Sequence, residues 1–270
     1  MVKEVKLIKK VKRLLRRLGM PRWLHHYGPK TYELYHHTVA LLVRAFCRLS
    51  YRRTVKLLDL LGIICPSKSA LQYTSSKLKP GLWNKILEIT SGYRHYIVTI
   101  DSTGLSRTNP SYHYLKRIDG KMPKKHVKLS ATLDTKKKKF CSAKIRILPR
   151  HDIKDAKSVL RNVNMSILVA DKGYDANWLH KDCYQNNIQA HIPMRNYGKK
   201  VKHNKLSYRR KASKLFRSRT YHRRSLIESG FHSIKTKCGS SVNSKKARTI
   251  KSDIYCRLVC HNLFGLIKDF

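Results

Sequence analysis

The stretch that decides the fold lies near the C-terminal end of the chain and reads YHRRSLIESGFHSIK, from Tyr221 to Lys235. In an α-helix, which turns by about 100° per residue, four polar residues of this stretch share one arc of roughly 60°. They are Tyr221, Arg224, Glu228 and Lys235. An apolar stripe lies beside that arc and consists of Ile227, Phe231 and Ile234. We therefore predict a half-buried helix that holds one carboxylate among cations.

Two aspartates elsewhere in the chain end short apolar runs. Asp101 follows Tyr96-Ile97-Val98-Thr99-Ile100, and Asp171 follows Ile167-Leu168-Val169-Ala170. Runs of this length and composition predict buried strands. Two strand-borne aspartates and one helix-borne glutamate supply the carboxylate oxygens that Mg²⁺ or Mn²⁺ prefers. We therefore predict that Asp101, Asp171 and Glu228 form a site for divalent metal that holds two ions.

These motifs resemble those of the DDE transposases of bacterial and archaeal insertion sequences, in the families numbered four and five. The helix motif of that family, Tyr-x2-Arg-x3-Glu-x6-Lys, is met in full by Tyr221, Arg224, Glu228 and Lys235. Its first aspartate precedes Ser, Gly or Thr, as in Asp101-Ser102-Thr103-Gly104, and its second stands in Asp-x-Gly-Tyr-Asp, here Asp171-Lys172-Gly173-Tyr174-Asp175. The resemblance covers about residues 94–265.

The resemblance implies an RNase H-like fold and an enzyme that cuts DNA and joins it to a target, by metal-dependent hydrolysis and transesterification. Asp101, Asp171 and Glu228 would be the catalytic residues and the ligands of Mg²⁺ or Mn²⁺. Arg224 and Lys235 would contact phosphates near the cut, and Tyr221 the terminal nucleotides. The implied partners are terminal inverted repeats and target DNA, bound by a homodimer or a higher oligomer because two ends are held at once.

The charge of the chain also points to nucleic acid. Lys and Arg number 60 and Asp and Glu 15 among 270 residues, which gives a formal net charge of +45. Such an excess favours a polyanion as partner. The apolar runs are far shorter than the roughly 20 residues that cross a bilayer, and no secretory signal is evident. We therefore expect no membrane partner and a cytoplasmic, nucleoid-associated protein. Seven scattered cysteines without a Cys-x2-Cys pair predict reduced thiols.

The first 92 residues are predicted to be all helical and to form a DNA-binding domain. Ser50 is a candidate N-cap for a helix over 51–61, residues 62–65 form a break, and Pro66-Ser67 opens a second helix over 68–78. Two short helices joined in this way are typical of a helix-turn-helix. On the second helix, the residues that would enter a DNA groove are Lys68, Ser69, Gln72, Tyr73 and Ser76. A plain helical hairpin is the alternative.

Residues 93–270 are predicted to form the catalytic domain, an α/β fold. We expect strands over 94–101, 128–134, 140–148, 167–170 and 188–192, and helices over 153–162, 176–186 and part of 252–270. A three-stranded meander followed by alternating strands and helices fits an RNase H-like mixed sheet flanked by helices. Asp152 and Asp175 are expected to cap the two helices that follow them, with metal ligation as the alternative for Asp175. Two basic segments, 109–125 and 195–219, are candidates for DNA contact.

Three functions are compatible with these patterns. The first is an insertion-sequence transposase that binds terminal inverted repeats and catalyses metal-dependent DNA cleavage and strand transfer during transposition. The second is a metal-dependent nuclease of RNase H-like fold that cuts without joining. The third is a non-catalytic DNA-binding protein from a decayed element. The complete acidic triad and the transposase-type helix motif favour the first.

Overall fold

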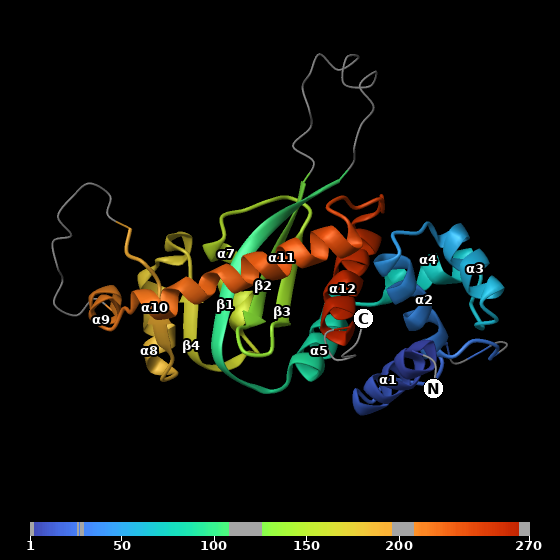
Figure 1. The fold of residues 1–270 in the computed structure, drawn as a ribbon, viewed down its shortest axis with the longest axis horizontal. Helices are drawn as coiled ribbons and strands as arrows, with labels where there is room; N and C mark the ends of the chain where they lie inside the picture. Colours follow the sequence, from blue (N-terminus) through green and yellow to red (C-terminus); the bar gives the residue numbers. More distant parts are fainter. Residues whose placement is uncertain (1–2, 26, 28–29, 108–125, 196–207, 265–270) are drawn as a thin grey trace, which may run out of the picture.

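A computed structural model describes residues 3–25, 27, 30–107, 126–195 and 208–264 (Figure 1). The segment 109–125, predicted to contact DNA, lies outside the described residues. So do residues 196–207 of the second basic segment and the last six residues of the chain. Within the described part, no helix is both long and apolar enough to cross a lipid bilayer.

The N-terminal region is helical, as predicted. Its helices are α1 (Lys3–Arg17), α2 (Leu34–Phe46), α3 (Tyr51–Leu60), α4 (Lys68–Lys77) and α5 (Pro80–Ser91). The Ser50 hydroxyl accepts a hydrogen bond from the Arg53 N–H at 3.2 Å, and the Ser67 hydroxyl accepts one from the Ala70 N–H at 3.3 Å. These two side chains satisfy N–H groups that the first turn of a helix leaves free, so α3 and α4 begin where the sequence indicates.

The rest of the chain is built on a five-stranded mixed sheet, which confirms the predicted α/β class. The strands are β1 (Arg94–Ser106), β2 (His126–Asp134), β3 (Lys139–Arg146), β4 (Asn164–Ala170) and β5 (Gln189–His191). Their order across the sheet is β3-β2-β1-β4-β5. The first three strands are antiparallel neighbours, whereas β4 runs parallel to β1 and β5 parallel to β4.

Helices cover both faces of this sheet. The C-terminal half contributes α7 (Ile153–Leu160), η1 (Lys172–Tyr174), α8 (Asn177–Gln185), α9 (Tyr208–Lys214), α10 (Ser218–Tyr221), η2 (His222–Arg224), α11 (Ser225–Cys238) and α12 (Ala247–Phe264). One apolar cluster packs Val98 and Ile100 of β1 against α7 and α8. The other packs Leu129 and Leu133 of β2 against α11 and α12. Figure 1 shows α11 crossing the sheet on the side opposite α7.

Helix α12 joins the sheet to the N-terminal helices. Its buried residues belong to the same apolar cluster as those of α1, α2 and α5. A buried ion-pair group fixes this junction, because Asp253 of α12 accepts from Arg44 of α2 at 2.8 Å and from Arg257 at 2.9 Å. Arg257 also donates to the carbonyls of Gly239 and Ser241, just after α11. The two halves of the chain therefore share a core, and their division at residue 92 stays a prediction.

Two asparagines cover the outer edge of β3. The Asn262 amide accepts from the Phe140 N–H and donates to the Phe140 carbonyl, both at 2.8 Å. The Asn84 amide does the same for Ala143, at 2.9 and 3.1 Å. An uncovered strand edge leaves such groups free to pair with another chain. Side chains from α12 and α5 thus take the place of a sixth strand.

Replacing Asn262 with Ala should destabilise the protein strongly. The Asn262 side chain is fully buried, and its loss leaves the Phe140 N–H and carbonyl without partners. We expect the free energy of unfolding, measured by urea denaturation, to fall by about 2–4 kcal/mol. Asn162→Ala, at an exposed turn, should change it by less than about 0.5 kcal/mol. Equal effects of the two substitutions would mean that the amide does not protect the edge.

Asp134 should make stability depend on pH. Its buried carboxylate binds His95 Nδ1 at 2.6 Å and accepts from the N–H groups of Lys136 and Lys137 at 2.7 and 2.8 Å. Burial raises the Asp134 pKa, but these bonds outweigh it and hold the pKa below its ordinary value. A lowered pKa in the folded state stabilises the protein above about pH 4, and this stability is lost as the pH falls through the folded-state pKa.

Asp134→Asn should therefore cost more stability at about pH 7 than at about pH 3. Urea denaturation of both proteins across this range measures the difference. Asp182→Asn, at an exposed position of α8, is the matched control and should give a small difference at every pH. A gap between Asp134→Asn and the natural protein that stays constant with pH would contradict this account.

Candidate active site

Strand pairing brings two of the predicted acids to the same level of the sheet. Ile100 of β1 pairs with Ala170 of β4, so Asp101 and Asp171 follow at neighbouring positions. Ile100 and Ala170 point into the cluster beneath the sheet with α7 and α8. Because side chains alternate along a strand, Asp101 points to the opposite face, where α11 lies. The Asp101 carboxylate accepts from the Ser102 N–H at 2.7 Å.

Helix α11 positions the third acid, Glu228, in its first turn. The predicted apolar stripe of this helix is confirmed, because Ile227, Phe231 and Ile234 are all buried. Gly230 allows α11 to lie close to the sheet, since a Cβ at this position would be 2.8 Å from Leu133 Cδ1. Any larger residue would push the helix away from β2 and would move Glu228 with it.

The stretch from Tyr221 to Lys235 is not one continuous α-helix, so the predicted single arc is wrong for its first residues. Tyr221 ends α10, His222–Arg224 forms the 3₁₀ turn η2, and α11 begins at Ser225. A 3₁₀ turn has about three residues per turn, which changes the direction of every side chain before it. The physical cause is local: the turn has no apolar residue to pack, and the Ser225 hydroxyl donates to the His222 carbonyl at 3.0 Å.

The structure brings Arg224 together with the acids and leaves the other two motif residues apart. Tyr221 packs its ring on Phe216, with 5.7 Å between ring centroids. Lys235 lies seven residues after Glu228, on the order of 10 Å farther along the helix axis. Both are partly exposed. Their contacts with DNA stay predictions.

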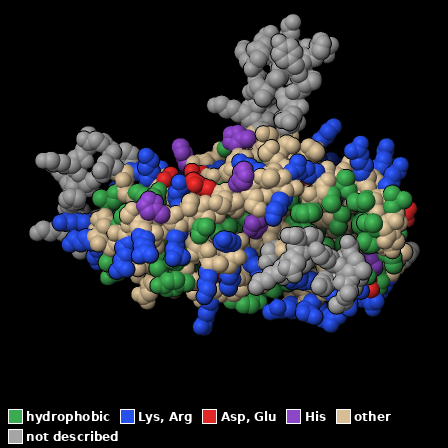
Figure 2. Space-filling view, viewed as in Figure 1, with side chains coloured by type: hydrophobic (Ala, Val, Ile, Leu, Met, Phe, Trp, Pro, Cys, Tyr) green, Lys and Arg blue, Asp and Glu red, His purple; other side chains and the backbone are tan. Residues whose placement is uncertain are grey.

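Arg224 is the centre of the site in this structure. Its Nη1 donates to Glu228 Oε1 at 2.8 Å and to Asp101 Oδ2 at 3.1 Å. Side chains of Asp101, Arg224 and Glu228 are 18%, 24% and 51% exposed, so the site opens to solvent on the Glu228 side. Figure 2 shows a small group of acidic side chains on this face, amid Lys, Arg and His side chains.

The electrostatics of Asp101 link all three acids. Burial raises the pKa of the Asp101 carboxyl, and the charges of Glu228 and Asp171 raise it further. The Ser102 N–H and the Arg224 guanidinium act in the opposite direction, and the pKa remains above its ordinary value. The charges of Glu228 and Asp171 both affect the Asp101 carboxyl, so the three acids form one cluster. Such clusters are typical of functional sites.

The carboxylates of Asp101, Asp171 and Glu228 are chemically suited to bind a divalent ion. In this structure, however, two of them are placed to bind the Arg224 guanidinium. Carboxylate oxygens are the ligands that Mg²⁺ and Mn²⁺ prefer. Two of the three acids already converge on one cation, Arg224. Among the residues that the structure describes, however, no group of three or more His, Cys, Asp or Glu side chains is arranged to hold a metal ion. Metal binding therefore stays a prediction, and it requires Arg224 to release its carboxylates.

Neither predicted helix cap, at Asp152 or Asp175, forms. Helix α8 follows Ala176, and the fully buried Asp175 carboxylate instead binds His180 at 3.0 Å, the Arg195 N–H at 2.8 Å and Arg209 at 3.0 Å. Burial raises the Asp175 pKa, but the bonds to His180 and Arg209 outweigh it and lower the pKa to about 2.

Asp152 binds Lys128 Nζ at 2.6 Å and the Ser102 hydroxyl, and its side chain makes no cap hydrogen bond to α7. In a chain so poor in acids, cations compete with the helix N–H groups for both carboxylates. The prediction that Asp152 and Asp175 cap helices is therefore wrong, because cationic side chains bind their carboxylates instead.

The residues predicted to read DNA share one face of α4. Lys68, Ser69, Gln72 and Tyr73 are exposed, whereas Leu71 is buried on the opposite side. Ser76 is partly exposed and donates to the Tyr73 carbonyl at 2.7 Å. The helix thus offers a polar surface with one aromatic ring. Binding of DNA to this face stays a prediction.

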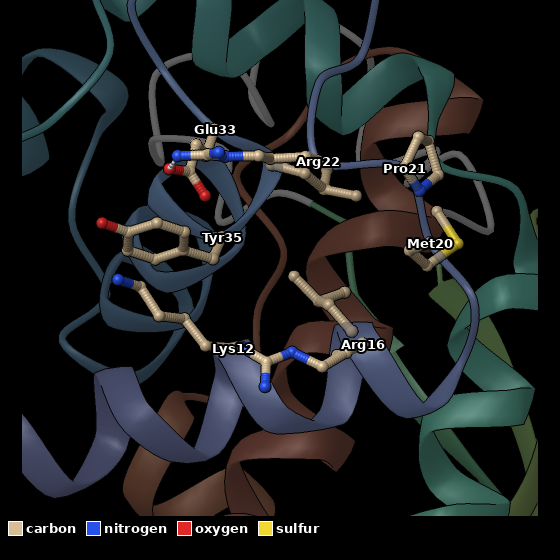
Figure 3. Close-up of a pocket in the computed structure, with 9 residues that line it drawn as sticks. Lys12, Arg16, Met20, Pro21, Arg22, Glu33 and Tyr35 are labelled. Atoms are coloured by element: carbon tan, nitrogen blue, oxygen red, sulfur yellow. Dashed lines mark hydrogen bonds and ion pairs between the residues drawn. The ribbon is translucent and has the colours of Figure 1, made fainter.

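Sequence reasoning missed a cavity of about 400 Å³ between α1 and α2 (Figure 3). Lys12 and Arg16 of α1 line it together with Tyr35, and so do Arg22 and Glu33, which pair at 2.7 Å. Lys12 Nζ lies 4.0 Å from the centre of the Tyr35 ring. The i, i+4 spacing of Lys12 and Arg16 was the available signal, but the packing of α1 on α2 cannot be seen in it.

Comparison with known proteins identifies the family. A family model described as the transposase DDE domain matches residues 92–263, more than half of the chain. No curated protein gives a match. Among solved structures, a cryo-EM structure of a piggyBac transposase synaptic complex with hairpin DNA is 12% identical with a TM-score of 0.41, over 98% of this chain and 74% of that chain. The match of the family model to these residues, which contain Asp101, Asp171 and Glu228, shows that the chain belongs to the transposase DDE domain family.

Proposed function

We propose that this protein is an insertion-sequence transposase that binds terminal inverted repeats and catalyses metal-dependent cleavage and strand transfer of DNA. The observation that carries the proposal is the shared contact of Asp101 and Glu228 with Arg224, with the Asp171 charge acting on the same carboxyl. Residues 127 positions apart in the sequence thereby form one acidic cluster inside a chain of net charge +45. The order β3-β2-β1-β4-β5, with three antiparallel strands first, supports an RNase H-like fold.

Each member of the cluster has a role in this proposal. Asp101, Asp171 and Glu228 would hold Mg²⁺ or Mn²⁺, which stabilises charge on the entering and leaving oxygens of the phosphodiester. Arg224 keeps the carboxylates together before DNA binds, because one guanidinium neutralises part of their mutual repulsion. When released, the same guanidinium is well suited to bind a phosphate in a bidentate manner. Lys235 and Tyr221 would contact the DNA beside the cut.

The N-terminal region would recognise the ends of the element. Helix α4 presents Lys68, Ser69, Gln72 and Tyr73 on one exposed face, and Ser67 caps its start. This geometry supports a helix-turn-helix made of α3 and α4. Joining two ends to one target requires two copies of the site, so we propose a homodimer or a higher oligomer on DNA.

Glu228→Gln should abolish DNA cleavage while leaving DNA binding in place. The amide keeps the size of the side chain but removes the charge that a metal ion and Arg224 both require. The test uses a supercoiled plasmid that carries the DNA flanking the gene, with Mg²⁺ present. We expect cleavage to fall about 100-fold or more, which corresponds to roughly 3 kcal/mol of lost transition-state stabilisation.

Asp182→Asn, a neutralised acid on α8, is the matched control and should cleave like the natural protein. Full cleavage by Glu228→Gln would end the proposal for this triad. A pre-cut end offered with target DNA separates the two catalytic alternatives, because a transposase joins it and a nuclease does not.

Substitutions on α4 should separate phosphate contact from base recognition. Lys68→Ala should weaken binding to all duplexes alike and reduce the slope of log affinity against log salt by about 0.9. Gln72→Ala should leave that slope unchanged and reduce the preference for the element ends by about 1–3 kcal/mol. Fluorescence anisotropy over a salt series measures both. Lys181→Ala on α8 is the control, and an equal change of slope in it would show that α4 is not the DNA-binding face.

A further inference from the structure

Arg195 lies beside Gly173, close to the carboxylates of Asp171 and Asp152. We propose that its guanidinium binds a phosphate group of the DNA strand at the site, in a basic cavity next to Asp171. This inference rests on the proposed function, since it concerns the DNA strand that the acidic cluster would cut. No motif of the helix stretch or of the two aspartate segments includes this residue.

The backbone and the side chain of Arg195 are both fixed to the segment that follows Asp171. The Arg195 N–H donates to the buried Asp175 carboxylate at 2.8 Å, and its Nε donates to the Lys172 carbonyl at 2.6 Å. Two anchors hold the main chain and the plane of the guanidinium separately. The Arg195 side chain therefore loses little conformational entropy when a ligand binds, and this favours a higher affinity for the ligand.

The Arg195 guanidinium and the carboxylates of Asp171 and Asp152 lie around Gly173, which has no side chain to separate them. A Cβ built on Gly173 would lie 3.5 Å from Arg195 Nη2, 3.7 Å from Asp171 Oδ2 and 3.8 Å from Asp152 Oδ2. The three groups therefore surround one point of the site. Asp152 is in turn bound by Lys128 at 2.6 Å, so part of its charge is already neutralised.

The space next to Arg195 has the size and charge for a phosphate. It is a cavity of about 600 Å³ between the end of β3, the start of α7 and η1. Arg150, His151, Lys154 and Arg195 line it, and Asp152 is the one acid among the described residues of its lining. Three cations and one carboxylate give this described lining an excess of positive charge. An arginine fork matches the oxygens of a phosphate better than any other side chain, and the volume admits a phosphate with its sugar.

A double substitution, in the protein and in the DNA, tests this contact. The probe is the terminal duplex that the natural protein cuts, with single phosphates near the cut replaced in turn by uncharged methylphosphonates. For the natural protein, one position should weaken binding about tenfold, measured with Ca²⁺ in place of Mg²⁺ so that no reaction occurs. Arg195→Ala should bind the unmodified duplex about tenfold more weakly and should lose all further sensitivity at that position.

Arg195→Ala keeps the main-chain bond to Asp175, so its fold should persist, and urea denaturation checks this. Arg161→Ala, an exposed arginine at the end of α7, is the matched control and should keep the sensitivity of the natural protein. Equal methylphosphonate effects in Arg195→Ala and the natural protein at every position would overturn the inference. Because Arg195→Ala retains the acidic triad, this failure is distinguishable from failure of the proposed function, which Glu228→Gln tests separately.

Discussion

The candidate site depends on one contact: the Arg224 guanidinium forms ion pairs with both Asp101 and Glu228. A chain with 60 basic and 15 acidic residues has few carboxylates, and each buried one in the described structure is bound by cations or N–H groups. Elsewhere these pairs fix the architecture, as Asp253 does between α2 and α12. At Arg224 the same chemistry gathers acids at a solvent-open position. In the proposed function, a divalent metal ion takes the place of the Arg224 guanidinium between these carboxylates.

Structural features outside the site determine where Asp101, Asp171 and Glu228 lie. Parallel pairing of β1 and β4 sets Asp101 level with Asp171, and the close approach at Gly230 sets the height of Glu228 above the sheet. The edge of β3 is closed by asparagines from α5 and α12, which pair with backbone groups of Phe140 and Ala143. Because α12 packs on α2 and α5, the N-terminal helices and the sheet share one apolar core.

The sequence predicted the parts of this structure that depend on apolar patterning. The strand residues before Asp101 and before Asp171 and the stripe of Ile227, Phe231 and Ile234 lie where apolar runs and helical spacing place them. Strand β1, however, continues past Asp101 to Ser106. Predictions based on single polar residues failed where tertiary partners competed. Asp175 was expected to cap α8, yet His180 and Arg209 bind it, and Arg209 is far away in sequence. The position of Arg195 also depends on such contacts, which no local pattern encodes.

The central claim is that Asp101, Asp171 and Glu228 jointly bind a divalent metal ion that takes over from Arg224. The most direct measurement is a crystal structure of the full chain grown with Mn²⁺, with anomalous scattering recorded to locate the metal. The account predicts an anomalous peak in contact with oxygens of these carboxylates and an Arg224 side chain that has left Asp101 and Glu228. Bound Mn²⁺ at other residues only, with Arg224 still between the two carboxylates, would contradict it.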